Sequence, residues 1–278
     1  MKVTKYSGEV VTFEKDKLKK SLFKSGACEA DVNRVLETIE KQLYDGIPTK
    51  KIYKMAFQLL KKIDNVHAAK YNLRSAIMAL GPAGFYFEKF VAKLFQLEGF
   101  ETMTNLTLDG KCVSHELDVL LKKDEEISMV ECKFHSSQDA KTDVKVPMYI
   151  LSRFNDLAVK EYTLFNKNNK ISKCRIITNN RFTEDAIQFA TCSHMELLSW
   201  NYPSGNSLKN KIDSYHIYPV TALTTLTLSE KDKLLTQNII TAKELLANKE
   251  WLVKIGLSEN RIKNVLKETN QLCNILKH

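Results

Sequence analysis

The chain has 278 residues, 44% of them hydrophobic, and a formal net charge of +9. This length indicates two or three small domains, and the excess of lysine and arginine favours a polyanionic partner such as nucleic acid. No stretch approaches the roughly 18 apolar residues of a membrane helix, and Met1 leads directly into Lys2 without an apolar leader. We therefore expect a cytoplasmic protein without a membrane partner. The six cysteines form no C-x-x-C pair, which predicts reduced thiols and argues against a zinc ribbon.

The first 80 residues have the pattern of a small α+β domain. Alternating segments at 3–6 and 10–13, separated by Gly8, predict a two-stranded hairpin. Apolar residues at helical spacing then predict helices at 15–24, 30–44, 49–63 and 66–80. The run Gly81-Pro82-Ala83-Gly84 is the clearest break in the chain and predicts a domain boundary.

The middle of the chain alternates between helical and strand patterns. The expected helices are at 85–99, 149–157 and 183–190, and the expected strands are at 101–107, 115–121, 127–134, 175–178 and 195–200. This alternation predicts an α/β layer fold with a mixed sheet. Residues 201–219 are expected to be irregular, and the tail from Ser229 is expected to be helical.

A pair of strands joined by a charged turn carries the residues that indicate chemistry. Period two places Glu116 and Asp118 on one face of the first strand, and Glu131 and Lys133 on one face of the second. If the turn is centred between residues 124 and 125, residue i pairs with residue 249 − i, so that Asp118 lies opposite Glu131. Directly opposed side chains are about 4.5–5.5 Å apart at Cβ, and two carboxylates so placed repel each other.

A hard divalent cation would remove this repulsion. Mg²⁺ favours one or two carboxylates together with water and substrate phosphate oxygens, and it can activate the attacking water. Lys133 would position that water or stabilise the developing negative charge. The same three residues on a solvent-facing sheet edge would be ordinary surface charges. The residues alone leave both interpretations open.

Residues 84–200 resemble the Mrr-type restriction endonucleases of the PD-(D/E)-x-K nuclease superfamily. The matching segments are Gly84-Phe85-Tyr86-Phe87-Glu88, Glu116-Leu117-Asp118-Val119, Glu131-Cys132-Lys133 and Thr178-Asn179-Asn180-Arg181-Phe182-Thr183. Many Mrr-like members have glutamine where this chain has Glu131, and glutamate is common there elsewhere in the superfamily, including in archaeal Holliday-junction resolvases. This departure leaves the choice of substrate open.

The resemblance implies a role for each of these acidic and basic residues. It implies that Asp118 and Glu131 bind the metal, that Lys133 is the catalytic lysine and that Glu88 is a supporting acid. It also implies a Mg²⁺- or Mn²⁺-dependent DNA endonuclease, acting in defence or repair. Because each site cuts one strand, cutting both strands of a duplex would favour a dimer or higher homo-oligomer. The alternatives are a structure-selective resolvase and a catalytically inactive DNA-binding protein that senses nucleotides.

Residues 1–80 resemble an ATP-cone, the nucleotide-sensing domain of ribonucleotide reductases and their repressor. The resemblance is carried by Val3-Thr4-Lys5, Gly8, Val11, Phe13, Lys17-Leu18, Ala68-Ala69-Lys70-Tyr71 and Arg74. It implies that Lys5, Lys17, Leu18 and Arg74 bind ATP or dATP. The chain has no P-loop, so the nucleotide is expected to be an allosteric effector and not a fuel.

The tail at 221–278 is expected to be a helical DNA-binding domain. Ile255-Gly256-Leu257-Ser258 resembles the hairpin of helix-hairpin-helix modules, in which glycine allows close backbone approach to a phosphate. Gly256, Ser258, Arg261 and Lys263 are the expected DNA contacts, although a plain helical cap would share this pattern. The predicted organisation is thus a cone at 1–80, a nuclease domain at 81–220 and the tail.

Overall fold

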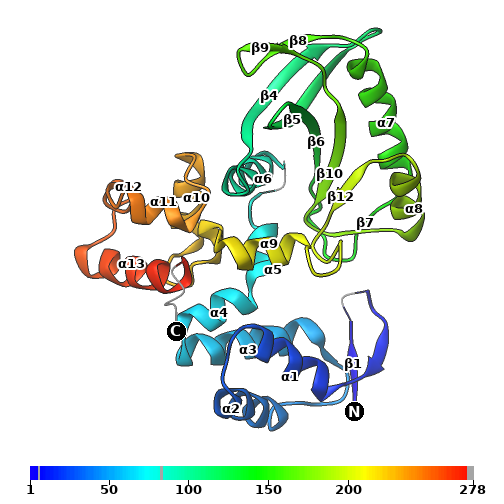
Figure 1. Ribbon diagram of the computed structural model, residues 1–278. Helices are drawn as coiled ribbons and strands as arrows, with labels where there is room; N and C mark the ends of the chain where they lie inside the picture. The colour runs from blue at the N-terminus through cyan, green and yellow to red at the C-terminus, as the bar shows by residue number, and fades with distance from the viewer. Residues whose placement is uncertain (6, 82–83, 274–278) are drawn as a thin grey trace. The chain divides into compact units, whose positions relative to one another are not determined.

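The computed structural model describes residues 1–5, 7–81 and 84–273, so Pro82 and Ala83 of the predicted boundary lie outside the described residues. The described chain falls into two compact units (Figure 1). Unit 1 combines residues 1–77 with the segment from Tyr218 onward, and unit 2 is Met78–Ile217. The first and last of the three predicted segments therefore share one unit. No helix among the described residues is long and apolar enough to cross a membrane.

The N-terminal part of unit 1 is a small sheet covered by helices. The sheet order is β2-β1-β3, with β2 antiparallel and β3 parallel to β1. The elements are β1 (Lys2–Thr4), β2 (Val10–Thr12), α1 (Lys15–Lys24), α2 (Glu29–Glu40), β3 (Ile47–Pro48), α3 (Thr49–Ile63), α4 (Asn65–Tyr71) and α5 (Leu73–Met78). The sequence pattern missed β3, because a two-residue strand has no measurable periodicity.

The helix expected at 66–80 is two helices that meet at Asn72. The Tyr53 hydroxyl donates to Asn72 Oδ1 at 2.9 Å and lies 3.1 Å from the Tyr71 carbonyl oxygen, so the side chain of α3 reaches the break. The Tyr53 and Tyr71 rings stack with centroids 4.8 Å apart. Asp64 begins α4 by accepting hydrogen bonds from the backbone N–H groups of Val66 and His67.

The C-terminal part of unit 1 is helical, as predicted. It contains the 3₁₀ turn η1 (Val220–Ala222) and helices α10 (Leu228–Thr236), α11 (Ala242–Ala247), α12 (Glu250–Lys254) and α13 (Glu259–Cys273). Its connecting segment is tied to the N-terminal helices. Thr221 Oγ1 donates to the Ala76 carbonyl at 2.6 Å, and Lys61 Nζ donates to the Thr224 carbonyl at 2.6 Å. These bonds explain why the two ends of the chain form one compact unit.

Unit 2 is a mixed five-stranded sheet between helices. Its order is β12-β10-β6-β5-β4, with β4, β5 and β6 antiparallel and β6, β10 and β12 parallel. These strands are β4 (Glu101–Asp109), β5 (Ser114–Lys123), β6 (Glu126–Lys133), β10 (Lys173–Thr178) and β12 (Glu196–Leu198). Helix α6 (Phe85–Leu97) covers one face, and α7 (Lys145–Ala158) and α8 (Glu184–Cys192) cover the other (Figure 1). The mixed α/β fold expected from the sequence is confirmed.

Several short elements of unit 2 were not expected. Two small strand pairs join β7 (Lys141–Thr142) to β11 (Arg181–Phe182) and β8 (Tyr162–Leu164) to β9 (Lys167–Asn169). The prediction that 201–219 is wholly irregular is wrong, because α9 spans Leu208–Tyr215. Ser207 caps this helix in a capping box with Asn210, a pattern that marks a helix start. The preceding Pro203 and Gly205 favoured an irregular segment instead.

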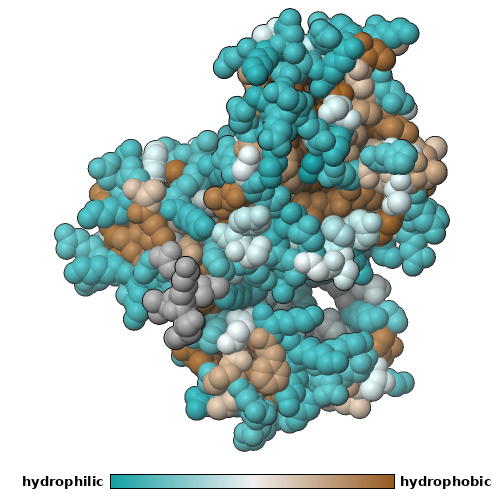
Figure 2. Space-filling view, in the orientation of Figure 1, coloured by the Kyte–Doolittle hydropathy of each residue, from teal (hydrophilic) through white to brown (hydrophobic). Residues whose placement is uncertain are grey.

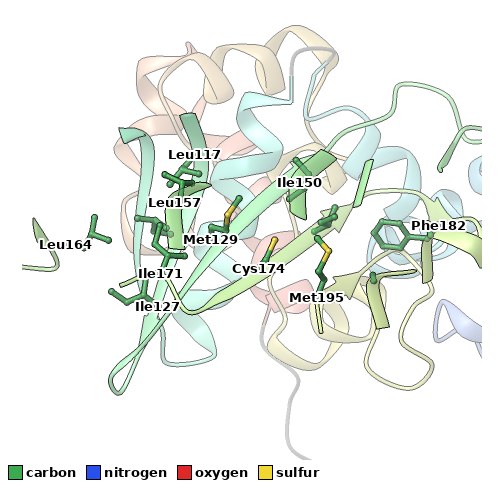
Figure 3. Close-up of a cluster of buried hydrophobic side chains, with 14 residues drawn as sticks. Leu117, Ile127, Met129, Ile150, Leu157, Leu164, Ile171, Cys174, Phe182 and Met195 are labelled. Carbon is green, nitrogen blue, oxygen red and sulfur yellow. The ribbon is translucent and has the colours of Figure 1, made fainter. Parts of the chain in front are cut away.

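The core between the sheet and α7 is apolar. Figure 3 shows side chains from β5, β6, β10 and α7 converging, among them Leu117, Met129, Ile150 and Cys174, and all four are buried. All six cysteines are free thiols, as expected. Residues of β5 and β6 are anchored in this core, and both strands also carry polar side chains that lie outside it, among them Asp118, Glu131 and Lys133.

Candidate active site

The predicted register of the hairpin is confirmed from Val119↔Val130 to Lys123↔Glu126. Backbone pairing of β5 with β6 stops there, one residue before Asp118 and Glu131. Pairing of β5 with β4 also skips Asp118. The skipped residue of β4 is Asn105, which has a positive φ of 55°. Asp118 Oδ2 instead accepts a hydrogen bond from the Cys132 backbone N–H at 2.7 Å. The carboxylate thus bridges two strands that have begun to separate.

Asp118 and Glu131 are half-buried carboxylates in a shared electrostatic environment. Burial raises the pKa of Asp118, while the hydrogen bond from Cys132 and the charge of Arg153 oppose the rise. Burial also raises the pKa of Glu131, and repulsion from Asp118 adds to the increase. Because both pKa values are raised, the protein alone does not fully compensate the negative charges of the two carboxylates. A bound cation would do so.

Arg153 of α7 is a site residue that the sequence reasoning missed. Its Nη1 donates to Glu131 Oε2 at 2.7 Å, and its Nη2 donates to the Glu116 carbonyl. Both side chains of this ion pair are mostly buried, at 11% and 19% exposed. Arg153 therefore restrains the orientation of Glu131. The sequence could have indicated Arg153 by its spacing, because a charged residue three positions after Ile150 and four before Leu157 falls beside the apolar face of the helix.

Lys133 ends β6 and is exposed. Its side chain makes no hydrogen bond or ion pair with the residues described, and its charge lowers the pKa of Asp118. It pairs in register with Thr178, the last residue of β10, so it lies at the carboxyl edge of the parallel strands. Crevices at this edge are common ligand sites in open α/β sheets.

Two adjacent asparagines hold the loop that follows Lys133. The buried Asn179 side chain accepts from the His135 N–H and donates to the His135 carbonyl, both at 2.8 Å. Asn180 Nδ2 donates to the Ser137 carbonyl at 2.8 Å. Both asparagines belong to a segment that resembles the Mrr-type family, but the resemblance implied no role for them. The structure shows that they brace the chain at residues 135 and 137, just after Lys133.

The two histidines that flank the hairpin in sequence have structural partners. His115 Nε2 lies 2.8 Å from Asp156 Oδ2, and Asp156 also accepts from the backbone N–H groups of Cys112 and Val113. His135 Nε2 lies 2.8 Å from Thr142 Oγ1. Burial, followed by the charge of Lys133, lowers the pKa of His135. These contacts give both rings structural roles.

Glu88 of α6 belongs electrostatically to the same carboxylate group. Burial raises its pKa to about 7, with further increases from Asp118, Glu116 and Glu131. Its Oε1 also approaches Gly84, where an added Cβ would lie 3.4 Å from it. The structure therefore brings Glu88 into the electrostatic field of the predicted metal ligands, although it lies on a different element.

We expect Glu88→Gln to stabilise the metal-free protein more at pH 8 than at pH 5. The folded-state pKa of about 7 exceeds the ordinary value of 4.5, so the folded state binds more protons between these values and its stability falls as pH rises. The neutral amide of glutamine avoids the loss of stability that ionisation of Glu88 causes, which is on the order of 1 kcal/mol after allowance for solvent screening. Chemical unfolding in EDTA measures the free energy of unfolding at each pH. Glu125→Gln, at the exposed hairpin turn, is the control, and equal effects of both variants at both pH values would contradict the expectation.

The donor set suits a hard cation. Among the described residues, no three His, Cys, Asp or Glu side chains are arranged to hold a metal ion by themselves. Mg²⁺ needs fewer protein ligands than that, because water and phosphate oxygens complete its octahedron. Asp118 and Glu131 supply oxygen ligands of the right kind, and Glu88 adds negative charge nearby.

The residues predicted to bind nucleotide lie directly after β1, on α1 and on α5. Lys5 follows β1 and pairs with Glu9 at 2.9 Å, and Lys17 on α1 pairs with Glu14 at 2.6 Å. These ion pairs are exposed, so they are weak and a triphosphate could displace them. Leu18 packs against the core of this unit, and Arg74 is half-buried on α5.

Residues 255–258, for which a helix-hairpin-helix hairpin was predicted, form the turn between α12 and α13. Gly256 has φ 88° and is exposed, while Ile255 and Leu257 on either side are buried. Ser258 and Lys263 are exposed. Arg261 already has partners within unit 1. Its guanidinium binds the Glu230 carboxylate and donates to the Thr225 carbonyl at 2.9 Å. A phosphate contact by Arg261 would compete with these bonds.

Comparisons with known proteins agree with this architecture. Residues 1–75 match the ATP cone domain, residues 82–201 match the family described as restriction endonuclease (Mrr_cat), and residues 218–273 match the family described as AF1548-like, C-terminal. An uncharacterized protein of Archaeoglobus fulgidus is 32% identical over 183 residues, which are 66% of this chain and 99% of that protein.

A solved structure supports the same grouping. The crystal structure described as "Protein of Unknown Function AF1548" is 30% identical with a TM-score of 0.56, and the match covers 68% of this chain and 97% of that chain. The chain therefore belongs to the AF1548-like family, and it combines an ATP cone domain, an Mrr-type restriction endonuclease domain and an AF1548-like C-terminal domain.

Proposed function

We propose that this protein is a Mg²⁺- or Mn²⁺-dependent DNA endonuclease whose activity responds to ATP or dATP. The observation that carries the proposal is the group formed by Asp118, Glu131 and Lys133. Two partly buried carboxylates with raised pKa values lie beside a lysine that has no protein partner among the described residues. This arrangement suits a site that binds a cation and a phosphate together.

The residues divide the work of hydrolysis. Asp118 and Glu131 would hold the metal, which supplies Lewis acidity to the phosphate and lowers the pKa of bound water. Asp118 is oriented by the Cys132 N–H, and Glu131 is oriented by Arg153. Lys133 places a positive charge at the carboxyl edge of β6, where it would stabilise the charge that develops on the phosphate oxygens. Glu88 would support the metal ligands from α6.

The remaining domains support substrate binding and control. The basic chain favours DNA, and the exposed backbone at Gly256, with Ser258 and Lys263 beside it, suits a phosphate contact by the tail. Lys5, Lys17, Leu18 and Arg74 would bind the nucleotide effector. Cutting both strands of a duplex calls for two sites, so we propose that a dimer or higher homo-oligomer is active.

The test is cleavage of a panel of DNA substrates by the purified chain. Linear duplex, single-stranded and four-way-junction DNA are incubated with Mg²⁺, with Mn²⁺ or with EDTA, each with and without ATP and dATP. We expect cleavage only with metal and a change in rate with nucleotide. Cleavage confined to the junction would favour a resolvase. Absence of cleavage on every substrate, with DNA and nucleotide binding retained, would favour an inactive nucleotide-sensing protein.

A further inference from the structure

Helix α7 has one buried face and one exposed face. Pro147, Ile150 and Leu157 are buried, and Ile150 and Leu157 lie within the core of unit 2 (Figure 3). The opposite side carries residues at helical spacing, namely Lys145, Met148, Tyr149 and Ser152, and all of them are exposed. Met148 is 51% exposed and Tyr149 is 63% exposed. Hydrophobic surface is also visible in Figure 2 on the side of unit 2 where Figure 1 places α7 and α8.

This exposed face is connected to the candidate active site through Arg153. The Arg153 Cζ lies 5.7 Å from the centre of the Tyr149 ring, and its Nη1 lies 2.7 Å from Glu131 Oε2. Arg153 is itself only 11% exposed. The Tyr149 ring therefore lies one side chain away from a proposed metal ligand. A guanidinium on an aromatic face also restrains that ring, which lowers the entropy lost when a ligand stacks on it.

The chemistry of the face suits a nucleobase beside a phosphate. Lys145 supplies a positive charge one turn from Tyr149. The nearest acidic residues are engaged: Asp143 accepts from the Lys145 backbone N–H, and Asp156, which is 13% exposed, is paired with His115. Aromatic rings bind bases by stacking without regard to sequence. In an intact duplex the faces of each base are covered by its neighbours, so a protein ring can stack only on a base that has left the helix.

We propose that the exposed face of α7 binds a single-stranded segment of DNA, with Tyr149 stacking on an unpaired base next to the phosphate that the candidate active site holds. This inference rests on the proposed nuclease function and specifies its substrate class, which is DNA with unpaired bases at the cleavage point. Arg153 is a positioning residue that links the base platform to Glu131. Lys145 contacts the backbone of the same strand.

The test measures binding separately from cleavage. Full-length protein carrying Asp118→Asn is titrated with a fluorescent single-stranded oligonucleotide and with a blunt duplex of the same sequence. Adding Tyr149→Ala is expected to weaken single-strand binding roughly tenfold and to leave duplex binding nearly unchanged, whereas Tyr149→Phe keeps the ring and the affinity. Tyr44→Ala, which removes a 50% exposed tyrosine from unit 1, is the matched control.

A second readout identifies stacking itself. The fluorescence of 2-aminopurine in the single strand is expected to be quenched by the Tyr149 and Tyr149→Phe proteins and not by Tyr149→Ala. Equal losses on both substrates, or no loss on either, would overturn the proposal. Dissociation of an oligomer by Tyr149→Ala with unchanged DNA binding would also overturn it, since the face would then be a contact between copies. Binding that depends on Tyr149 in a protein that never cuts DNA would leave the platform standing and sink only the nuclease function.

Discussion

Replacement of Asp118 by asparagine is expected to lower the rate of Mg²⁺-dependent DNA cleavage by roughly a thousandfold. Loss of an anionic ligand removes several kcal/mol of metal-derived transition-state stabilisation, and each 1.4 kcal/mol corresponds to about tenfold in rate. The asparagine oxygen can still accept the hydrogen bond from the Cys132 N–H, so the strand geometry is retained. Single-turnover cleavage with saturating protein measures the chemical step.

The same assay separates the lysine from the carboxylates. Lys133→Ala is expected to reduce cleavage by about 10²- to 10³-fold while metal affinity stays nearly unchanged, because the lysine acts on the phosphate and not on the cation. Asp124→Asn is the matched control, since it lies at the tip of the same hairpin with φ 55°, a conformation that asparagine tolerates. Wild-type cleavage rates in both Asp118→Asn and Lys133→Ala would contradict the assignment of these residues to the active site, because cleavage would then come from another centre.

Replacement of Glu268 by alanine is expected to destabilise unit 1 by about 3 kcal/mol or more. Glu268 is 2% exposed and accepts hydrogen bonds from the Thr224 N–H at 2.7 Å, the Thr225 N–H at 2.9 Å and the Thr225 hydroxyl at 2.6 Å. Alanine leaves the buried Thr224 N–H and the partly buried Thr225 donors without this acceptor, and each buried unpaired group costs about 1–3 kcal/mol. The lost bonds hold the segment that Lys61 of α3 also binds.

Thermal and chemical unfolding of the full chain measure this effect. Glu259→Ala, an exposed position on the same helix, is the control and is expected to change stability by less than about 0.5 kcal/mol. Nearby, burial lowers the pKa of Lys231 to about 8, and the charge of Glu268 works against that decrease. Removing Glu268 should therefore lower the pKa of Lys231 further. Similar unfolding midpoints for Glu268→Ala and Glu259→Ala would show that the buried carboxylate does not hold the two ends of the chain together.

The sequence was most informative where structure is local. The register between Val119 and Lys123 and their partners followed from alternation and from the position of the charged turn, which both operate over a few residues. Helices α1, α3 and α6 were found by the spacing of their apolar residues. The short strand β3 and helix α9 were not predicted, because β3 is too short to show periodicity and α9 lies between turn-forming residues.

Contacts between distant segments could not be read in the same way. The backbone ladder between β5 and β6 ends one pair before Asp118, and the Asp118 carboxylate is bonded to the Cys132 N–H, a side-chain contact that the register does not predict. The guanidinium of Arg153 comes from 22 residues beyond Glu131. The Asn179 side chain, 44 residues from His135, holds the loop after β6. None of these pairs shares an element whose periodicity could connect them.

By itself, the sequence determined the mixed α/β architecture, the hairpin that carries Asp118, Glu131 and Lys133, and the resemblance to an ATP-cone joined to an Mrr-type nuclease. The tertiary structure decided how the carboxylates are oriented, that Glu88 shares their field and that the tail packs with the cone in one compact unit. The physical reason is the range of the interactions. Propensity and periodicity act over a few residues, whereas burial, ion pairing and pKa depend on groups that come together only when the chain has folded.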